Sequence, residues 1–294
     1  MNVEVVDYEA PDAPRNFTRS LHETGFAVLV NHPLPQELVQ RIYDEWLGFF
    51  ESEAKFAYRF SDDNQDGYFG QDVSETAKGH TLRDIKEFFH VYTWGRYPSE
   101  VSNDALEYAA KAKEIANTLL GWVEAETPPE VAAGFSRPLN QMMDGSTRTL
   151  LRVLRYPPLS GDEPEGAVRA ASHEDINLLT VLPAANEPGL QVKDTAGNWH
   201  DVPCDFGSLV INCGDMLALA SGGYYPSTSH RVMNPTGESA RRSRLSLPLF
   251  LHPADDVVLS EDRTAFSFLQ ERLAELRSQD LKPATAHAPI TSQS

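Results

Sequence analysis

After residue 145 the sequence breaks into short apolar or alternating runs that are separated by turn residues. Runs of this length suit strands better than helices, and Asp194-Thr-Ala-Gly197 between two of them is a hairpin signal. A succession of short strands with frequent turns predicts a β-sandwich, jelly roll or barrel. The runs cover residues 150–154, 178–182, 189–192, 208–212, 216–220, 229–232 and 245–251.

The residues before 145 have a different hydrophobic pattern, in which apolar side chains recur mainly at helical spacing. The spacing predicts helices over 15–24, 35–54, 102–127 and 130–143, a buried strand over 26–31 and a polar loop over 61–79. A last helix is expected over 262–277, followed by a polar, mobile tail over 279–294. We therefore expect a helix-rich region over 1–145, a β core over 146–255 and a helical C-terminal segment over 256–294.

The charge balance narrows the possible partners. With 25 basic and 43 acidic residues, the 294-residue chain carries a net charge of −18. Such a field repels nucleic-acid backbones and anionic membrane surfaces, and it would suit a cation-bearing small-molecule substrate. The sequence has no signal-peptide pattern and no apolar run long enough to span a membrane, so a cytoplasmic location is expected. No pattern in the sequence indicates an oligomeric state.

His173 and Asp175 lie two residues apart beside an apolar run, so in a strand they would share one face. Such a pair forms either a surface hydrogen bond or two ligands of a metal ion. A second histidine, His230, begins another short strand farther along the chain. Two imidazoles and one carboxylate are the ligand set of non-haem Fe(II) centres, and zinc also accepts them.

Arg244-Leu-Ser246 opens a further strand, with Arg244 and Ser246 on one face. A guanidinium inside a β core requires an anion, and its planar fork matches a carboxylate. Either an internal acid or a bound dicarboxylate of the shape of 2-oxoglutarate would satisfy Arg244. Arg241 fits the same three-residue pattern with Ser243, but it lies in a polar turn.

Taken together, these motifs resemble the isopenicillin N synthase-like family of iron- and 2-oxoglutarate-dependent dioxygenases. His173-Glu-Asp175, His230 and Arg244-Leu-Ser246 match the H-x-D, distal H and R-x-S motifs of that family in order. The segments 25–32, 86–89 and 154–157 resemble its two N-terminal signatures and the strand that enters its core. The resemblance covers most of the chain.

The resemblance implies a double-stranded β-helix (jelly-roll) core, mostly β with α, and a helix-rich N-terminal region packed around it. It implies Fe(II) bound by His173, Asp175 and His230, with dioxygen and the cosubstrate 2-oxoglutarate, which is converted to succinate and CO2. The product would be a hydroxylated, desaturated or cyclised small molecule. The expected cosubstrate-binding residues are Arg244, Ser246, Tyr156 and Asn212, and the candidate substrate-pocket residues are Tyr68, Phe69, Phe88, His90, Arg155 and Tyr224.

At one segment the sequence departs from the usual motif of this family, and this leaves alternatives to a 2-oxoglutarate-dependent function open. Leu154-Arg-Tyr156 replaces a more usual Asn-x-Tyr or Tyr-Tyr pattern, and it resembles isopenicillin N synthase itself, which uses no 2-oxoglutarate. An Fe(II) oxidase of that type or an ethylene-forming enzyme is therefore an alternative function. A metal-binding jelly roll without redox chemistry is another. A zinc hydrolase would lack a use for Arg244 and would have only Glu174 as a nearby general base.

Overall fold

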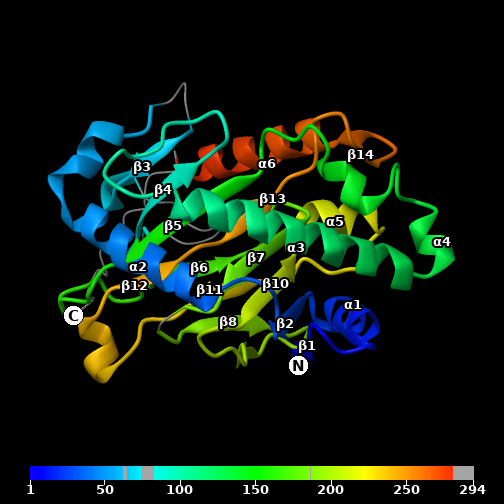
Figure 1. Cartoon of the computed structure of the whole chain (residues 1–294), viewed down its shortest axis with the longest axis horizontal. Coiled ribbons are helices and arrows are strands. Elements are labelled where there is room, and N and C mark those ends of the chain that lie inside the picture. Colours follow the sequence, from blue (N-terminus) through cyan, green and yellow to red (C-terminus); the bar gives the residue numbers. More distant parts are fainter. Residues whose placement is uncertain (62–64, 74–82, 186, 281–294) are drawn as a thin grey trace, which may run out of the picture.

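Two largely antiparallel sheets carry most of the strands of the computed structural model, which describes residues 1–61, 65–73, 83–185 and 187–280 (Figure 1). The larger sheet has the order β1-β2-β10-β7-β13-β5-β4-β3, with β12 also paired to β5, and the smaller sheet has the order β6-β11-β8-β9. The larger sheet contains β1 (Val5–Asp7), β2 (Phe26–Val30), β3 (Gly67–Phe69), β4 (Glu87–Val91), β5 (Leu150–Tyr156), β7 (Leu179–Pro183), β10 (Leu209–Cys213), β12 (Arg244–Ser246) and β13 (Leu249–Leu251). The smaller sheet contains β6 (Ala170–His173), β8 (Leu190–Lys193), β9 (Trp199–Asp201) and β11 (His230–Val232), and β14 (Val258–Ser260) pairs with β15 (Arg263–Thr264).

Helices cover the outer face of the larger sheet, where α2 and α3 lie across it in Figure 1. The fully buried Tyr108 of α3 anchors this layer, because its hydroxyl donates to the carbonyls of Val181 and Leu247 in or beside the sheet. The helices are α1 (Ala13–Thr24), α2 (Gln36–Glu51), α3 (Asp104–Glu126), α4 (Pro129–Ala132), α5 (Asp215–Ala220) and α6 (Ala265–Asp280). Short 3-10 turns are η1 (Glu53–Tyr58), η2 (Gln71–Val73), η3 (Leu139–Met143) and η4 (Gly237–Arg241).

Strand alternation divides the interior into two cores. Ala27 and Leu29 of β2 pack toward the helices, whereas Phe26 and Val28 of the same strand belong to a second cluster that also contains Val192 of the smaller sheet. The second cluster lies between the two sheets, which is the interior of a jelly roll. The expected fold class is therefore confirmed.

The N-terminal strands extend the core sheet on both sides. β1 and β2 continue it beyond β10, and β3 and β4 continue it beyond β5. The division of the chain near residue 145 stays a prediction, because the sheet and the helix-side core include residues from both sides of it. Among the described residues, none of the helices combines the length and the hydropathy that a membrane crossing requires.

Some predicted elements were wrong. The run 216–220 forms the helix α5 and not a strand, because a short apolar run fits either state and its Met, Leu and Ala are strong helix formers. The predicted helix over 130–143 is interrupted at Gly134 and Pro138, which leave only α4 and η3. Most other predicted helices and strands are confirmed within a few residues.

Two further differences between the predicted and the observed elements concern a short strand within a predicted loop and a predicted strand that is interrupted. The segment 61–79 was predicted as a loop, but Gly67–Phe69 within it forms β3 by pairing with β4. The run 245–251 is divided into β12 and β13 just before Pro248, which lacks the amide hydrogen that a strand interior needs. The tail was predicted over 279–294, but α6 continues to Asp280, and the rest of the tail, from residue 281 onward, lies outside the described residues.

Candidate functional site

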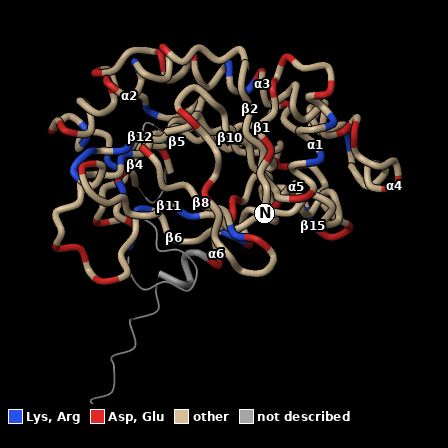
Figure 2. The backbone as a smooth tube through the Cα atoms, turned by 90° about the horizontal axis from the view of Figure 1, so that it is seen from below, with Lys and Arg blue, Asp and Glu red and all other residues tan. Residues whose placement is uncertain are grey.

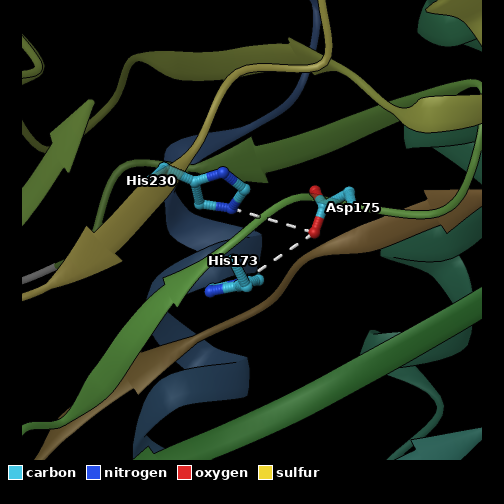
Figure 3. Close-up of side chains that lie close together, drawn as sticks. All are labelled: His173, Asp175 and His230. Carbon is cyan, nitrogen blue, oxygen red and sulfur yellow. Dashed lines mark ion pairs between the residues drawn. The ribbon is translucent and has the colours of Figure 1, made fainter. Parts of the chain in front are cut away.

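His173, Asp175 and His230 come together between the two sheets (Figure 3). His173 ends β6 and His230 begins β11, and these two residues are direct partners in the antiparallel pair. The Nε2 atoms of His173 and His230 lie 4.0 Å and 3.8 Å from Oδ1 of Asp175. One donor atom from each side chain lies within 4.8 Å of the other two, a spacing that a single metal ion could bridge.

Hydrogen bonds to the backbone hold both imidazoles in the tautomer that a metal requires. The Nδ1 atom of His173 lies 2.8 Å from the carbonyl oxygen of Ala171, and that of His230 lies 3.1 Å from the carbonyl oxygen of Thr228. A carbonyl can only accept, so each Nδ1 carries the proton. This leaves each Nε2, on the side of Asp175, as the nitrogen that could bind a metal, as in metal-bound histidines whose other ring nitrogen donates to a carbonyl.

Asp175 is oriented by bonds to its other oxygen. Thr180 and Asn212 donate to Oδ2 at 2.5 Å and 2.8 Å, which leaves Oδ1 directed at the two histidines. Burial alone would raise the pKa of Asp175, but the neighbouring His230 and His173 and these two hydrogen bonds outweigh it and lower the pKa. Burial and the proximity of His230 lower the pKa of His173. The two shifts favour an ionised Asp175 carboxylate beside a neutral His173 imidazole, the protonation states in which these two side chains bind a divalent metal.

The loop that carries Asp175 is packed against the start of α5. The amide of Asp215 donates to the carbonyl of Asp175 at 2.7 Å, and the amide of Gly214 donates to that of Leu178 at 3.0 Å. A Cβ atom at position 214 would lie 2.2 Å from the carbonyl oxygen of Asn177, so this close approach requires glycine. The carboxylate is thus positioned by a loop that the turn before α5 holds in place.

A buried guanidinium lies at one end of the pocket. Arg244 of β12 is opposite Tyr156 of β5, and its Cζ atom lies 5.2 Å from the centre of the Tyr156 ring. Its Nε donates to the carbonyl of Glu187, while its buried Nη1 has no hydrogen-bond partner among the described residues. Ser246 lines the same pocket. An unsatisfied buried cation beside a candidate metal site fits an anionic ligand.

The four predicted cosubstrate residues all line one pocket with the triad, and one of them, Asn212, is also hydrogen-bonded to a triad residue. Arg244, Ser246, Tyr156 and Asn212 lie along the pocket that His173, Asp175 and His230 also line. The side-chain amide of Asn212 is hydrogen-bonded to Asp175.

The predicted substrate-pocket residues separate into three groups, and none of them is among the residues that line the pocket of the triad. Phe69, Phe88 and His90 form one aromatic cluster on the side of β3 and β4 that faces the inter-sheet core. Tyr68 and Arg155 lie on the opposite side of the sheet and contact the buried Glu87, because each is one residue out of phase with the pocket-facing positions. Tyr224 stacks on His22 and is not among the pocket-lining residues.

Sequence reasoning missed two cationic residues that line the pocket, Lys86 and Arg152. Arg152 could have been found, because it lies at i−4 from Tyr156 and therefore on the same face of the strand. Lys86 precedes β4, and no periodic pattern predicts its direction.

Two family models match the chain. The 2OG-Fe(II) oxygenase superfamily matches residues 148–253, and the N-terminal region described as "non-haem dioxygenase in morphine synthesis N-terminal" matches residues 4–111. The first match contains all three residues of the triad and Arg244, and the second contains β1 to β4 and the helices between them.

Comparison with individual proteins also finds similarity to oxygenases. Gibberellin 2-beta-dioxygenase 2 of Arabidopsis thaliana is 27% identical over 262 residues, which are 86% of this chain and 74% of that protein. A Shewanella oneidensis chain assigned as an oxygenase is 55% identical, with a TM-score of 0.86 over 94% of this chain and 99% of that one. A full-length Neurospora crassa protein, crystallised in complex with alpha-KG, is 19% identical with a TM-score of 0.75 over 92% of this chain and 95% of that one, and shares the fold. The chain belongs to the 2OG-Fe(II) oxygenase superfamily, whose members require Fe(II) and 2-oxoglutarate.

Proposed function

We propose that His173, Asp175 and His230 bind Fe(II) in an enzyme that oxidises a small molecule with 2-oxoglutarate as cosubstrate. The observation that carries this proposal is the convergence of the Nε2 atoms of two histidines on one carboxylate oxygen inside a pocket. Two imidazoles and a carboxylate suit non-haem Fe(II) and leave other coordination positions for ligands. The donor set therefore fits the metal that the family requires.

The buried Nη1 of Arg244 supports the assignment of the cosubstrate. Its guanidinium is the group expected to bind the distal carboxylate of 2-oxoglutarate, and the Ser246 hydroxyl on the same face would add a hydrogen bond. Tyr156 would hold the guanidinium in place through its ring. Asn212 would act on the metal side, by orienting Asp175.

The pocket supplies the remaining requirements of such a reaction. With Fe(II) bound, the site would allow dioxygen to act as the four-electron oxidant, with two electrons from 2-oxoglutarate, which becomes succinate and CO2, and two from the small-molecule substrate. The chain contributes apolar walls from Phe26, Leu182 and Val232, which keep water from the reacting groups. The direct partners His173 and His230 hold the metal donors on strands, which fix their geometry more firmly than loops would.

Relatives indicate the chemical class of the reaction. Those with curated names include a gibberellin 2-beta-dioxygenase, a flavonol synthase/flavanone 3-hydroxylase and a feruloyl CoA ortho-hydroxylase. All of these names describe the oxidation of small molecules, and several are hydroxylations. We infer a small-molecule substrate for this enzyme. The match to the 2OG-Fe(II) oxygenase model favours use of 2-oxoglutarate over the oxidase alternative.

The test is anaerobic titration of the protein with Fe(II) and 2-oxoglutarate, followed through the weak visible charge-transfer band of their complex. We expect a band that needs both additions, is lost in His173→Ala and needs much more 2-oxoglutarate in Arg244→Met. Iron binding without the band would instead favour an oxidase that uses no 2-oxoglutarate. Failure of wild-type protein to bind iron would contradict the assignment of the triad.

A further inference from the structure

A second guanidinium lies at the same end of the pocket as Arg244. Arg169 is 0% exposed, and it directly precedes β6, whose first residue, Ala170, lines the pocket. The Cζ atom of Arg169 lies 6.0 Å from the centre of the Tyr156 ring, and that of Arg244 lies 5.2 Å from the same centre. Arg169 is not among the lining residues, so it lies behind this end of the pocket wall.

The Arg169 side chain connects the two sheets. Its backbone amide donates to Oδ1 of Asn234 at 2.9 Å, and Nδ2 of Asn234 donates to the carbonyl of Ala167 at 2.7 Å, which fixes the backbone before β6. Its Nη2 donates to the carbonyl of Arg242 at 3.0 Å, shortly before β12 begins at Arg244. The guanidinium is therefore held close to the strand that carries Arg244. In Figure 2, Lys and Arg positions gather near this strand and near β4.

The rest of this guanidinium has no partner. Nε and Nη1 of Arg169 are buried and form no hydrogen bond with any of the described residues. Glu187 lies in this region, but its carboxylate is 3.1 Å from Nε of Arg242, and its backbone carbonyl accepts from Nε of Arg244 at 3.0 Å. A buried cation with unmade hydrogen bonds costs free energy, so the ligand-free protein keeps this arrangement against its own stability.

Arg231 of the smaller sheet shows the contrast with a structural arginine. Its Nε donates to Oε1 of Gln191 at 2.9 Å, and its Cζ atom lies 4.0 Å from the centre of the Trp199 ring. This guanidinium therefore has its partners in the ligand-free protein. Arg169 is more deeply buried and has fewer partners, which is the pattern expected where a ligand supplies the missing charge.

The two buried guanidiniums also act on each other. Burial lowers the pKa of Arg169 and the charge of Arg244 lowers it further, whereas Tyr156 and Glu187 raise it. Arg169 stays protonated all the same, because arginine does not lose its proton in proteins. A carboxylate bound to Arg244 would carry the opposite sign, so Arg169 would attract it through the same poorly screened interior.

We propose that Arg169 is a second cation of the cosubstrate subsite, which acts with Arg244 to select a 2-oxo acid that carries a distal carboxylate. This inference rests on the proposed function, because it takes Arg244 as the residue that binds that carboxylate. Arg169 supplies positive charge from behind the pocket wall. The bound carboxylate in turn compensates the two guanidiniums that the ligand-free protein keeps together.

The experiment is anaerobic titration of the Fe(II)-loaded protein with two 2-oxo acids, followed through the visible charge-transfer band. The probes are 2-oxoglutarate and 2-oxopentanoate, which has the same carbon chain but a methyl group in place of the distal carboxylate. Both present the same head group to the metal, so the ratio of their dissociation constants reports only recognition of the distal end. Arg231→Met is the matched control, because it removes a cation of the smaller sheet that is not among the pocket-lining residues.

Three substitutions separate the charge of Arg169 from its contact with Arg242. Arg169→Met removes both, Arg169→Gln keeps an amide donor without the charge, and Arg169→Lys keeps the charge. We expect wild-type protein to prefer 2-oxoglutarate strongly. Arg169→Met and Arg169→Gln should each weaken 2-oxoglutarate about 10- to 100-fold and leave 2-oxopentanoate unchanged, because only the former carries the second carboxylate. Arg169→Lys should keep most of the preference, and Arg231→Met all of it.

An unchanged ratio in Arg169→Met and Arg169→Gln would overturn the proposal, even if urea denaturation showed both variants to be less stable, since Arg169 would then be structural. Equal loss of preference in Arg169→Lys would also overturn it, because the charge would not be the cause. Should Arg169→Met fail to fold, Arg169→Gln and Arg169→Lys still decide between these outcomes. Absence of the band in wild-type protein with 2-oxoglutarate contradicts the proposed function, whereas a normal band with an unchanged ratio contradicts only this inference.

Discussion

His173 and His230 are direct partners across the β6–β11 pair, with ring centres 4.4 Å apart. Their spacing is therefore set by strand register, which the buried faces of both strands specify strongly. Asp175 lies outside this pair, on a loop, and depends on side chains and backbone groups around it. The strands fix two of the donors, and hydrogen bonds fix the third.

Replacement of Asn212 by leucine should weaken metal binding without loss of the fold. Asn212→Leu removes the donor to Oδ2 of Asp175 in a side chain of similar size. Loss of such an orienting partner costs about 10- to 100-fold in metal affinity. Mn(II) titration would measure it, with Asn16→Leu on the distant helix α1 as control. Equal metal affinity in Asn212→Leu and wild type would show that Asp175 is oriented without this bond.

Metal affinity should be insensitive to pH near neutrality and fall in mild acid. Because burial and His230 lower the pKa of His173 below its ordinary value of 6.5, this imidazole stays neutral in the metal-free protein until the pH falls below that value. At His173, protons therefore compete with the metal only below about pH 6.5. Mn(II) titrations between pH 5 and 8 would test this. A marked loss of affinity between pH 8 and 7 would contradict the lowered pKa.

The sequence was sufficient for the fold class and for the residues of the candidate triad, for a physical reason. His173 and Asp175 stand at a fixed spacing beside a strand, and strand period decides which side chains share a face. Strand period also puts Arg244 and Ser246 on one face, and both line the pocket. Features that depend on local period could thus be predicted.

Features that depend on pairing between distant segments could not be predicted. Arg155 was expected in the pocket, but its strand phase and the register of β5 against β4 direct it to Glu87. The strand Gly67–Phe69 is too short to give a pattern and exists through its pairing with β4. Lys86 lines the pocket because Asp84 connects it to β6, a contact across the fold. These relationships come from tertiary structure alone.

Substitution of Gly214 should disturb the metal site from a distance. In Gly214→Ala the new methyl group would meet the carbonyl oxygen of Asn177 at 2.2 Å, so the loop that carries Asp175 must move. Overpacking of this kind costs about 1–3 kcal/mol of unfolding free energy, and displacement of the carboxylate should also weaken Mn(II) binding. Urea denaturation and metal titration measure the two effects.

Gly121→Ala is the control for this prediction. Gly121 lies in α3, and a methyl group there would meet nothing within 4 Å. The exchange should therefore be neutral or stabilise the protein by up to about 1 kcal/mol. If Gly214→Ala matched Gly121→Ala in both urea denaturation and metal titration, the close approach of position 214 to the Asn177 carbonyl would contribute nothing to stability or metal binding.

Arg155 should contribute to stability and not to ligand binding. Its Nη1 lies 2.8 Å from the buried Glu87, which also accepts from Lys55 at 3.0 Å and from Tyr68 at 2.5 Å. Arg155→Met removes one cation and leaves a buried carboxylate less compensated, which should cost about 3 kcal/mol of unfolding free energy. The exposed pair of Arg148 with Asp255 gives the comparison, because Arg148→Met should cost under about 1 kcal/mol.

The two measurements together distinguish a structural residue from a pocket residue. Urea denaturation should separate Arg155→Met from Arg148→Met by about 2 kcal/mol, while both retain wild-type affinity for 2-oxoglutarate. The opposite pattern, with normal stability and weakened 2-oxoglutarate binding in Arg155→Met, would place Arg155 at the cosubstrate. It would also mean that the register between β4 and β5, which directs Arg155 away from the pocket, differs in solution.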